Sequence, residues 1–333
     1  MFHYIVSITI ILIFLMALIL YVSLDKKVVY KTLQNKHVVV TGGSSGIGKA
    51  AAIEAAKLGA NVTIIGRDIA KLKIAVSEII EHCMDKSEQK IQYAALDVTS
   101  KYETISQCLS KLESDVGPIF MLVNCAGTCV CGQFENMKEQ DIKMMIDLNY
   151  FGTAYPTRYV LKPMKERDEG LIVFVSSEAA FIGIYGYSAY SAAKWALRGL
   201  AESLIMELVG TNVRLTLAFP PDTDTPGFEK EELTKPEETK LISGSGGLHS
   251  ADVIGKKIIQ DAMIGRTYSV FSFSGKLLSI LNCGSIESTS QVLIQVFSMG
   301  LLRAIIVSIM LSFHKIVKNG LKKRKQLEKQ KAH

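Results

Sequence analysis

The chain has 333 residues, of which 48% are hydrophobic and 21% are charged, and its formal net charge is +6. This length suits one large domain or two small ones. Much of the positive charge lies between Lys315 and Lys331, and no motif typical of nucleic-acid binding accompanies it. None of the six cysteines forms a Cys-x-x-Cys pair and the histidines are scattered, so the sequence predicts free thiols and neither a zinc site nor a disulfide framework.

The first apolar run, from Tyr4 to Val22, contains 19 uncharged residues. As a helix it would extend about 28 Å, which is enough to cross the core of a bilayer. A signal peptide is the alternative, but no basic residue precedes the run, so residues 1–25 favour an uncleaved membrane anchor. Lysines between positions 26 and 36 follow at once and predict that the next domain faces the cytosol.

A glycine-rich loop follows the first predicted strand, 36–41, and opens a helix that extends to about Leu58. Glycines allow a tight turn and let a pyrophosphate approach bare N–H groups at a helix N-terminus. The pattern Gly-x-x-x-Gly-x-Gly lacks the lysine of a triphosphate-binding loop, so a dinucleotide is predicted. Its expected contacts are Gly42, Ser44, Ser45, Gly46, Ile47 and Gly48.

Strands and helices then alternate along the chain. Strands are predicted at 61–66, 91–96, 119–125, 171–176, 213–219 and 268–271, and helices at 69–83, 100–115, 138–162, 187–209 and 251–264. Repeated β–α units predict an α/β fold with a Rossmann-type, doubly wound parallel sheet in a single catalytic domain, residues 36–271. Ligands of such sheets bind beyond the carboxyl ends of the strands. The distinctive residues fall at these ends: Gly42, Arg67, Asp97, Asn124, Ser177 and Pro220.

Two basic residues bear on the choice of dinucleotide. Arg67 ends the second strand and Lys71 lies one turn into the next helix, which favours NADPH because cations accommodate its 2′-phosphate. Asp68 is the competing signal, since an acidic side chain there would bind the ribose hydroxyl of NAD.

Tyr190 and Lys194 are four residues apart in a segment with helical character, so their side chains share one helix face. A nearby cation favours the phenolate and is expected to lower the pKa of Tyr190 from its usual value near 10. On its own the spacing is also compatible with a core tyrosine beside a surface lysine.

Taken together, these motifs resemble the short-chain dehydrogenase/reductase family over residues 36–265. The resemblance implies that Tyr190 donates a proton to a carbonyl oxygen, and that Lys194 lowers the pKa of Tyr190 and binds the nicotinamide ribose. Ser177 would hydrogen-bond the substrate oxygen, with Ser176 as the alternative, and Asn149 would hold a water that relays protons to Lys194. Tyr190 is also among the implied cofactor contacts. The others are Asp97 at the adenine, Asn124, Ala126 and Gly127 near the ribose, and Pro220.

The connection 220–243 and the apolar C-terminal segment resemble those of a membrane-anchored branch of that family, whose members reduce the ketone of long-chain sphingoid bases. This long, polar connection is expected to be a loop that closes over the substrate. Alternatives are an oxidoreductase of steroids, retinoids or fatty-acyl ketones, and a catalytically silent NADP-binding scaffold. Residues 272–314 are expected to cross the membrane twice or to lie in its interface, with a soluble dimerisation helix pair as the third possibility.

The basic segment 315–333 is expected to be a cytosolic tail, for which a solvated, disordered charge run is the simplest interpretation. Its last lysines, Lys329 and Lys331, resemble a retrieval signal for the endoplasmic reticulum. The expected partners are therefore a long-chain keto substrate and a membrane, with a homo-oligomer left as an open alternative, and no nucleic acid is expected.

Overall fold

The computed structural model describes residues 29–282 and 289–331, together with six positions nearer the N-terminus: Tyr4, Ser7, Ile11, Phe14, Leu15 and Leu18. Most of the predicted anchor, and residues 283–288 of the predicted C-terminal membrane region, therefore lie outside the described residues.

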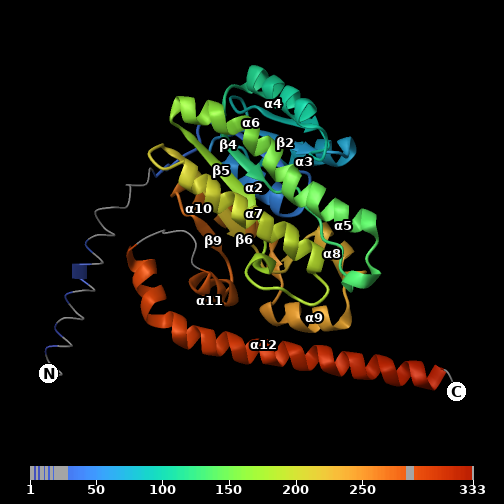
Figure 1. Ribbon diagram of the computed structural model, residues 1–333. Coiled ribbons are helices and arrows are strands. Elements are labelled where there is room, and N and C mark those ends of the chain that lie inside the picture. Colours follow the sequence, from blue (N-terminus) through green and yellow to red (C-terminus); the bar gives the residue numbers. More distant parts are fainter. Residues whose placement is uncertain are drawn as a thin grey trace.

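Within the described residues, seven parallel strands form one sheet in the order β3-β2-β1-β4-β5-β6-β9 (Figure 1). The strands are β1 (His37–Thr41), β2 (Asn61–Gly66), β3 (Ile91–Ala95), β4 (Ile119–Asn124), β5 (Gly170–Val175), β6 (Val213–Phe219) and β9 (Tyr268–Val270). The strand order reverses between β1 and β4, which creates the crevice where ligands of such sheets bind. The predicted doubly wound α/β sheet is confirmed.

Helices cover both faces of the sheet, and for this reason the central strands are apolar on both sides. One face packs against α2 (Gly46–Lys57), α3 (Ile69–Glu81) and α10 (Ala251–Met263). The other packs against α4 (Tyr102–Val116), α6 (Gly152–Arg167) and α7 (Ser188–Glu207). In β1, Val38 and Val40 belong to the first core and Val39 to the second, and all three are fully buried.

The helix predicted over 138–162 is confirmed as one continuous helical segment, but it contains a π turn that was not predicted. The segment forms α5 (Glu139–Ile146), a π-helical turn η2 (Asp147–Phe151) and α6. A π turn inserts one extra residue per hydrogen-bonded ring and often marks a functional site. Here it contains Asn149, whose carbonyl oxygen accepts a hydrogen bond from Thr153 Oγ1 at 3.1 Å.

The connection after β6, which was expected to be a long loop, contains two short helices, α8 (Pro226–Glu232) and α9 (Glu237–Ser243). The hydroxyl oxygen of Thr225 accepts from the backbone N–H of Phe228 at 3.1 Å, and Pro226 occupies the first helical position of α8. A capping threonine followed by proline is a recognised helix start. Two-residue strands β7 (Thr223–Asp224) and β8 (His249–Ser250) pair across the base of this segment.

The C-terminal region forms α11 (Phe273–Leu281) and the 43-residue helix α12 (Thr289–Lys331). Figure 1 shows α12 passing along the body of the protein beside α11 and α9. The basic segment expected to be a disordered tail is thus helical, and Arg324 Nη1 lies 2.7 Å from Glu238 Oε1 on α9. No helix in the described part of the chain is long and apolar enough to span a membrane.

Close packing of α2 against α10 leads to a stability prediction. A Cβ added at Gly255 would lie 2.6 Å from Ala51 N and 2.7 Å from Ala50 Cβ, whereas Gly199 on α7 has open space around it. We expect Gly255→Ala to lower the free energy of unfolding by about 2 kcal/mol, because overpacking outweighs the gain in helix propensity. Gly199→Ala should raise it by up to about 1 kcal/mol. Denaturant unfolding of both variants checks this, and a stabilised Gly255→Ala protein would contradict it.

Candidate active site

A cavity of about 970 Å³ opens at the carboxyl ends of the strands. The glycine loop, the ends of β2, β4, β5 and β6, the start of α7 and part of α12 form its walls. The sequence-predicted residues that line it are Gly42, Ser44, Ser45, Gly46, Ile47, Gly48, Arg67, Lys71, Asp97, Ala126, Gly127, Asn149, Ser176, Ser177, Tyr190, Lys194 and Pro220.

The glycine loop has the shape needed to hold a phosphate group against the start of α2. Gly42 and Gly46 have φ values of +68° and +53°, which residues with a Cβ rarely adopt. A Cβ at Gly48 would lie 2.4 Å from Gly42 O, so the loop closes only without a side chain there. Gly46 approaches Thr225 in the segment after β6, with 2.9 Å between an added Cβ and Thr225 Cγ2. The loop is therefore a tight anion cradle at a helix N-terminus.

Basic groups stand at the far end of this cradle, where β2 ends. Arg67 Nη1 lies 3.8 Å from Asp97 Oδ2, and the side chain of Arg67 is 72% exposed. Such an exposed ion pair contributes little to stability, so the guanidinium remains available to a ligand. Asp68 does not line the cavity, because its carboxylate accepts from Lys71 N at 3.1 Å and caps α3. Asp68, the acidic residue that favoured NAD in the sequence, therefore caps α3 instead of facing the cavity.

Tyr190 and Lys194 both line the cavity from the first turns of α7. Lys194 is buried, its Nζ donates a hydrogen bond to Val175 O at 2.9 Å, and it lies 5.6 Å from the centre of the Tyr190 ring. Burial lowers the pKa of Lys194 to about 8. The lysine is therefore not a surface residue beside a core tyrosine.

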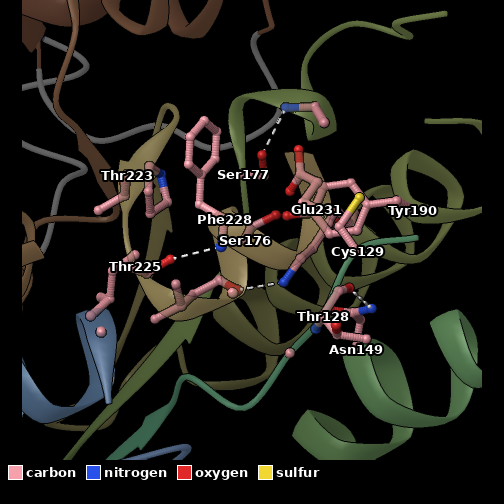
Figure 2. A pocket seen from close by; sticks show the side chains of 18 of the residues that line it. Thr128, Cys129, Asn149, Ser176, Ser177, Tyr190, Thr223, Thr225, Phe228 and Glu231 are labelled. Carbon is pink, nitrogen blue, oxygen red and sulfur yellow. Dashed lines mark hydrogen bonds between the residues drawn. The ribbon is translucent and has the colours of Figure 1, made fainter. Parts of the chain in front are cut away.

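The pKa of Tyr190 differs from the sequence-based expectation. Burial raises it well above its usual value, nearby Cys129 and the Glu231 carboxylate act in the same direction, and the Ser177 hydroxyl acts against them. Figure 2 shows the side chains of Tyr190, Cys129 and Glu231 close together. The predicted lowering by Lys194 is not among these causes. A raised pKa keeps the phenol protonated at neutral pH, as a proton donor requires.

The two adjacent serines have different partners. Ser176 is buried, and its hydroxyl donates to Lys194 O at 3.3 Å, which attaches the end of β5 to α7. Ser177 Oγ accepts from Ala179 N at 3.2 Å (Figure 2), and the Ser177 hydroxyl lowers the pKa of Tyr190. Of the two, Ser177 is thus the serine whose hydroxyl acts on the pKa of Tyr190.

Asn149 and Lys194 face the same small space beside Gly127. A Cβ at Gly127 would lie 2.8 Å from Asn149 Oδ1 and 3.5 Å from Lys194 Nζ. Asn149 is fully buried, and its Nδ2 donates to Thr128 O and Met145 O, each at 3.0 Å (Figure 2). The π turn therefore presents the amide of Asn149 to the loop after β4.

Asn124 is the predicted contact that the structure places outside the cavity lining. It is 1% exposed, and its amide nitrogen donates to Thr157 Oγ1 at 3.1 Å and Val173 O at 3.4 Å. Its observed role is to hold β4 against β5 and α6.

One wall of the cavity was not predicted from the sequence. Apolar side chains of α11 and α12 extend the cavity away from Tyr190, and Phe228 and Ile242 of α8 and α9 join them. The contributions of α11 and α12 are Phe273, Leu277, Leu278, Ile305, Ile306, Ile309 and Phe313. No local signal marks these residues, because they reach the cavity only after α12 folds back across the domain.

Tyr187, beside Tyr190 in the cavity wall, was also not predicted as a site residue. Tyr187 precedes Tyr190 by one helical turn, their ring centres are 5.6 Å apart, and the Tyr187 hydroxyl donates to Glu231 Oε1. The spacing of three residues could have indicated Tyr187, since such residues share a helix face.

A family model described as short chain dehydrogenase matches residues 36–236. The chain belongs to this family. Among solved structures, levodione reductase superposes with a TM-score of 0.65 at 20% identity and covers 74% of this chain and 98% of its own. A short chain dehydrogenase from Burkholderia phymatum, solved in complex with NAD, gives a TM-score of 0.64 at 22% identity over 72% of this chain and 90% of its own. These similarities concern the fold.

Relatives found by sequence have a higher identity to this chain than these solved structures do. A Danio rerio protein named 3-dehydrosphinganine reductase is 44% identical over 88% of this chain and 89% of its own. A Bos taurus protein named 3-ketodihydrosphingosine reductase is 44% identical over 89% of this chain and 90% of its own, and one from Dictyostelium discoideum with the same name is 38% identical over 81% and 84%. As a short chain dehydrogenase with such relatives, the chain is an oxidoreductase acting on a ketone or alcohol.

The buried ammonium of this short chain dehydrogenase predicts a pH-dependent stability. Lowering the pKa of Lys194 from 10.5 to about 8 costs about 3 kcal/mol while the group is charged in the folded state. The cost is complete below the folded pKa, declines between the two values because only the unfolded chain then binds the proton, and vanishes above 10.5.

Lys194→Met should therefore raise the free energy of unfolding at a pH of about 7 by about 2 kcal/mol, after the loss of one hydrogen bond. The gain over the unsubstituted protein should shrink as the pH rises from about 8 towards 10.5. Denaturant unfolding of both proteins across this range measures the difference, and a gain that is constant with pH would contradict the assignment.

Proposed function

We propose that this chain reduces 3-ketodihydrosphingosine to dihydrosphingosine with NADPH, a step of sphingolipid synthesis. The observation that carries the proposal is one continuous cavity in which Tyr190, Lys194 and Ser177 stand between a glycine cradle and a long apolar wall. Such a cavity fits a ketone next to a polar head and an extended hydrocarbon chain. The names of relatives that match over almost their whole length support the same reaction.

The residues present fit NADPH. The bare backbone of Gly42 to Gly48 leaves room for a pyrophosphate at the N-terminus of α2, and Arg67 and Lys71 supply positive charge for the 2′-phosphate. With Asp68 engaged at the start of α3, no acidic side chain from that position lines the cavity. Bound NADPH supplies the hydride that reduces the carbonyl carbon.

The protein contributes the proton and the positioning. Tyr190, whose raised pKa keeps it protonated, donates its proton to the carbonyl oxygen. Ser177 hydrogen-bonds the same oxygen and stabilises the negative charge that develops on it. Lys194 places an ammonium beside the Tyr190 ring and remains largely charged at neutral pH, so it stabilises the phenolate left after transfer. Asn149 faces the space beside Lys194 and is suited to holding a water that returns the proton.

Membrane association at the endoplasmic reticulum, with the catalytic domain facing the cytosol, is part of the proposal. It is supported by large apolar side chains that α12 exposes: Ile294, Val296, Phe297, Leu301 and Leu311. An apolar helix face followed by a basic segment is typical of helices that lie in a bilayer interface. Because α12 also lines the cavity, a lipid substrate could enter from the bilayer.

The cofactor assignment predicts the behaviour of an Arg67 variant. Arg67→Ala should raise the KM for NADPH by about tenfold to a hundredfold, because a charge-assisted contact to the 2′-phosphate is lost. The KM for NADH should not change. Steady-state kinetics with both cofactors measures the effect, and Lys73→Ala, which removes an exposed charge of α3 outside the cavity lining, is the matched control. Equal losses with NADPH and NADH would refute the phosphate contact.

Turnover of the detergent-solubilised full chain tests the proposed reaction. We expect oxidation of NADPH with 3-ketodihydrosphingosine, and much less with NADH, with a 3-ketosteroid or with a short-chain analogue that cannot occupy the apolar wall. Tyr190→Phe should lower kcat by about 10²-fold to 10⁴-fold and leave NADPH binding unchanged. Tyr155→Phe, which removes a hydroxyl outside the cavity lining, should retain activity.

The other possible outcomes distinguish between the alternative functions. Turnover of the steroid alone would replace the substrate class but keep the catalytic residues. NADPH binding without turnover of any ketone would favour a binding scaffold. Loss of NADPH binding in Tyr190→Phe would refute the role assigned to the phenol.

A further inference from the structure

A cluster of metal-ligating groups lies beside the tyrosine end of the cavity. The sulfurs of Cys129 and Cys131 and a carboxylate oxygen of Glu231 lie within 4.8 Å of one another. The cysteines belong to the loop after β4 and Glu231 to α8, about a hundred residues further along the chain. The fold brings these residues together although the sequence shows no zinc-binding spacing.

The separation of the sulfurs matches a tetrahedral metal site. Cys129 Sγ and Cys131 Sγ are 3.6 Å apart. Zinc binds thiolates at about 2.3 Å, so two sulfurs on a tetrahedral zinc ion lie about 3.8 Å apart. The two thiols therefore need to move by only a few tenths of an ångström, whereas a disulfide would require them to approach to about 2 Å.

Glu231 has an oxygen to offer. Its Oε1 accepts from the Tyr187 hydroxyl and lies 2.9 Å from Lys235 Nζ, so its known partners are on the same atom. They hold the carboxylate in place beside the thiols. Two thiolates and one carboxylate are a ligand set that zinc accepts, with water in the fourth position.

Beside the thiols, three carboxylates pair with two ammonium groups. Three carboxylates, those of Asp222, Glu231 and Glu232, lie 3.6, 2.9 and 2.6 Å from Lys235 Nζ, and the side chain of Lys235 is fully buried. Lys240 lies 3.5 Å from Glu232, so carboxylates outnumber ammonium groups here. A bound divalent cation would offset the charge of the two thiolates in this half-buried place.

We propose that Cys129, Cys131 and Glu231 form a binding site for Zn²⁺. Each thiol releases its proton to solvent as its bond to zinc forms. Cys129 and Glu231 line the cavity and lie near Tyr190, so zinc and its water occupy the place of the reacting ketone (Figure 2). Zinc is then a reversible inhibitor that competes with the ketone and not with NADPH. The inhibition rests on the proposed function, whereas the metal site does not.

The first experiment uses Co²⁺ as a spectroscopic probe of the full chain, purified in detergent with its thiols reduced. One Co²⁺ should bind per chain, with the thiolate charge-transfer absorption and the intense visible bands of tetrahedral Co²⁺, and Zn²⁺ should remove both. Cys131→Ser and Cys131→Ala should lose the thiolate absorption. Cys108→Ser, which changes a half-buried thiol on α4, should retain it. Octahedral Co²⁺ spectra, or full thiolate absorption in both Cys131 variants, would overturn the site.

The second experiment measures Zn²⁺ inhibition of turnover. Cys131 is buried outside the cavity lining, so its variants should keep their turnover but need at least about tenfold more Zn²⁺ for half-inhibition, since an outer contact alone can change metal affinity tenfold. Cys108→Ser should be inhibited like the unsubstituted protein. If Zn²⁺ inhibited the Cys131 variants as strongly as Cys108→Ser and the unsubstituted protein, the proposed inhibition through this site would be overturned. If no ketone is reduced while Co²⁺ binds as described, the proposed function fails and the metal site stands.

Discussion

The active site depends on an ammonium group that the fold buries. Lys194 donates to Val175 O, the last residue of β5, and the next residue, Ser176, donates back to Lys194 O. These two bonds hold the first turns of α7 against the end of β5, and this brings Ser177 to Tyr190. The cost of keeping a charged lysine in this place is compensated by packing elsewhere, and proteins accept such a cost mainly where function requires it. The Tyr-x-x-x-Lys spacing is therefore both a structural clamp and a chemical unit.

The sheet was predictable because its central strands are buried on both faces. A strand covered on both faces is a continuous apolar run, and turn residues end each run, so the boundaries of β2 and β6 agree with their prediction to the residue. The π turn at Asn149 was not predictable in this way. Its residues have the composition of an ordinary helix, and the turn is stabilised by contacts from Asn149 to Thr128 in another segment, which no local pattern contains. The glycine loop and Tyr190 could be placed at the cavity from the sequence because each belongs to a short motif with a fixed residue spacing.

The segment after β6 failed as a prediction for a related reason. Thr225 and Pro226 form a recognisable helix start in the sequence. However, α8 and α9 have only seven residues each, and such short helices are marginally stable without tertiary contacts. Lys235 supplies such contacts by joining three carboxylates of this segment, and Thr239 donates to Tyr185 O at 2.7 Å. The same dependence on distant partners hid the cluster of Cys129, Cys131 and Glu231. Sequence reasoning thus identified most of the polar residues that line the cavity and missed those that three-dimensional packing adds to it.

The contacts of α9 connect the apolar wall to the catalytic helix. Gly186, immediately before Tyr187, has a φ of +82°, and a Cβ there would lie 2.5 Å from Thr239 Oγ1, so α9 packs directly on the start of α7. On its other side α9 meets α12, where a Cβ at Gly320 would lie 2.0 Å from Glu238 Oε1 and Arg324 pairs with the same carboxylate. A displacement of α12 would therefore change the apolar wall and the support of α7 together. Because one helix closes the apolar end of the cavity and, through α9, braces the segment that carries Tyr190, the position of α12 would affect both the chain binding and the proton transfer of the proposed reaction.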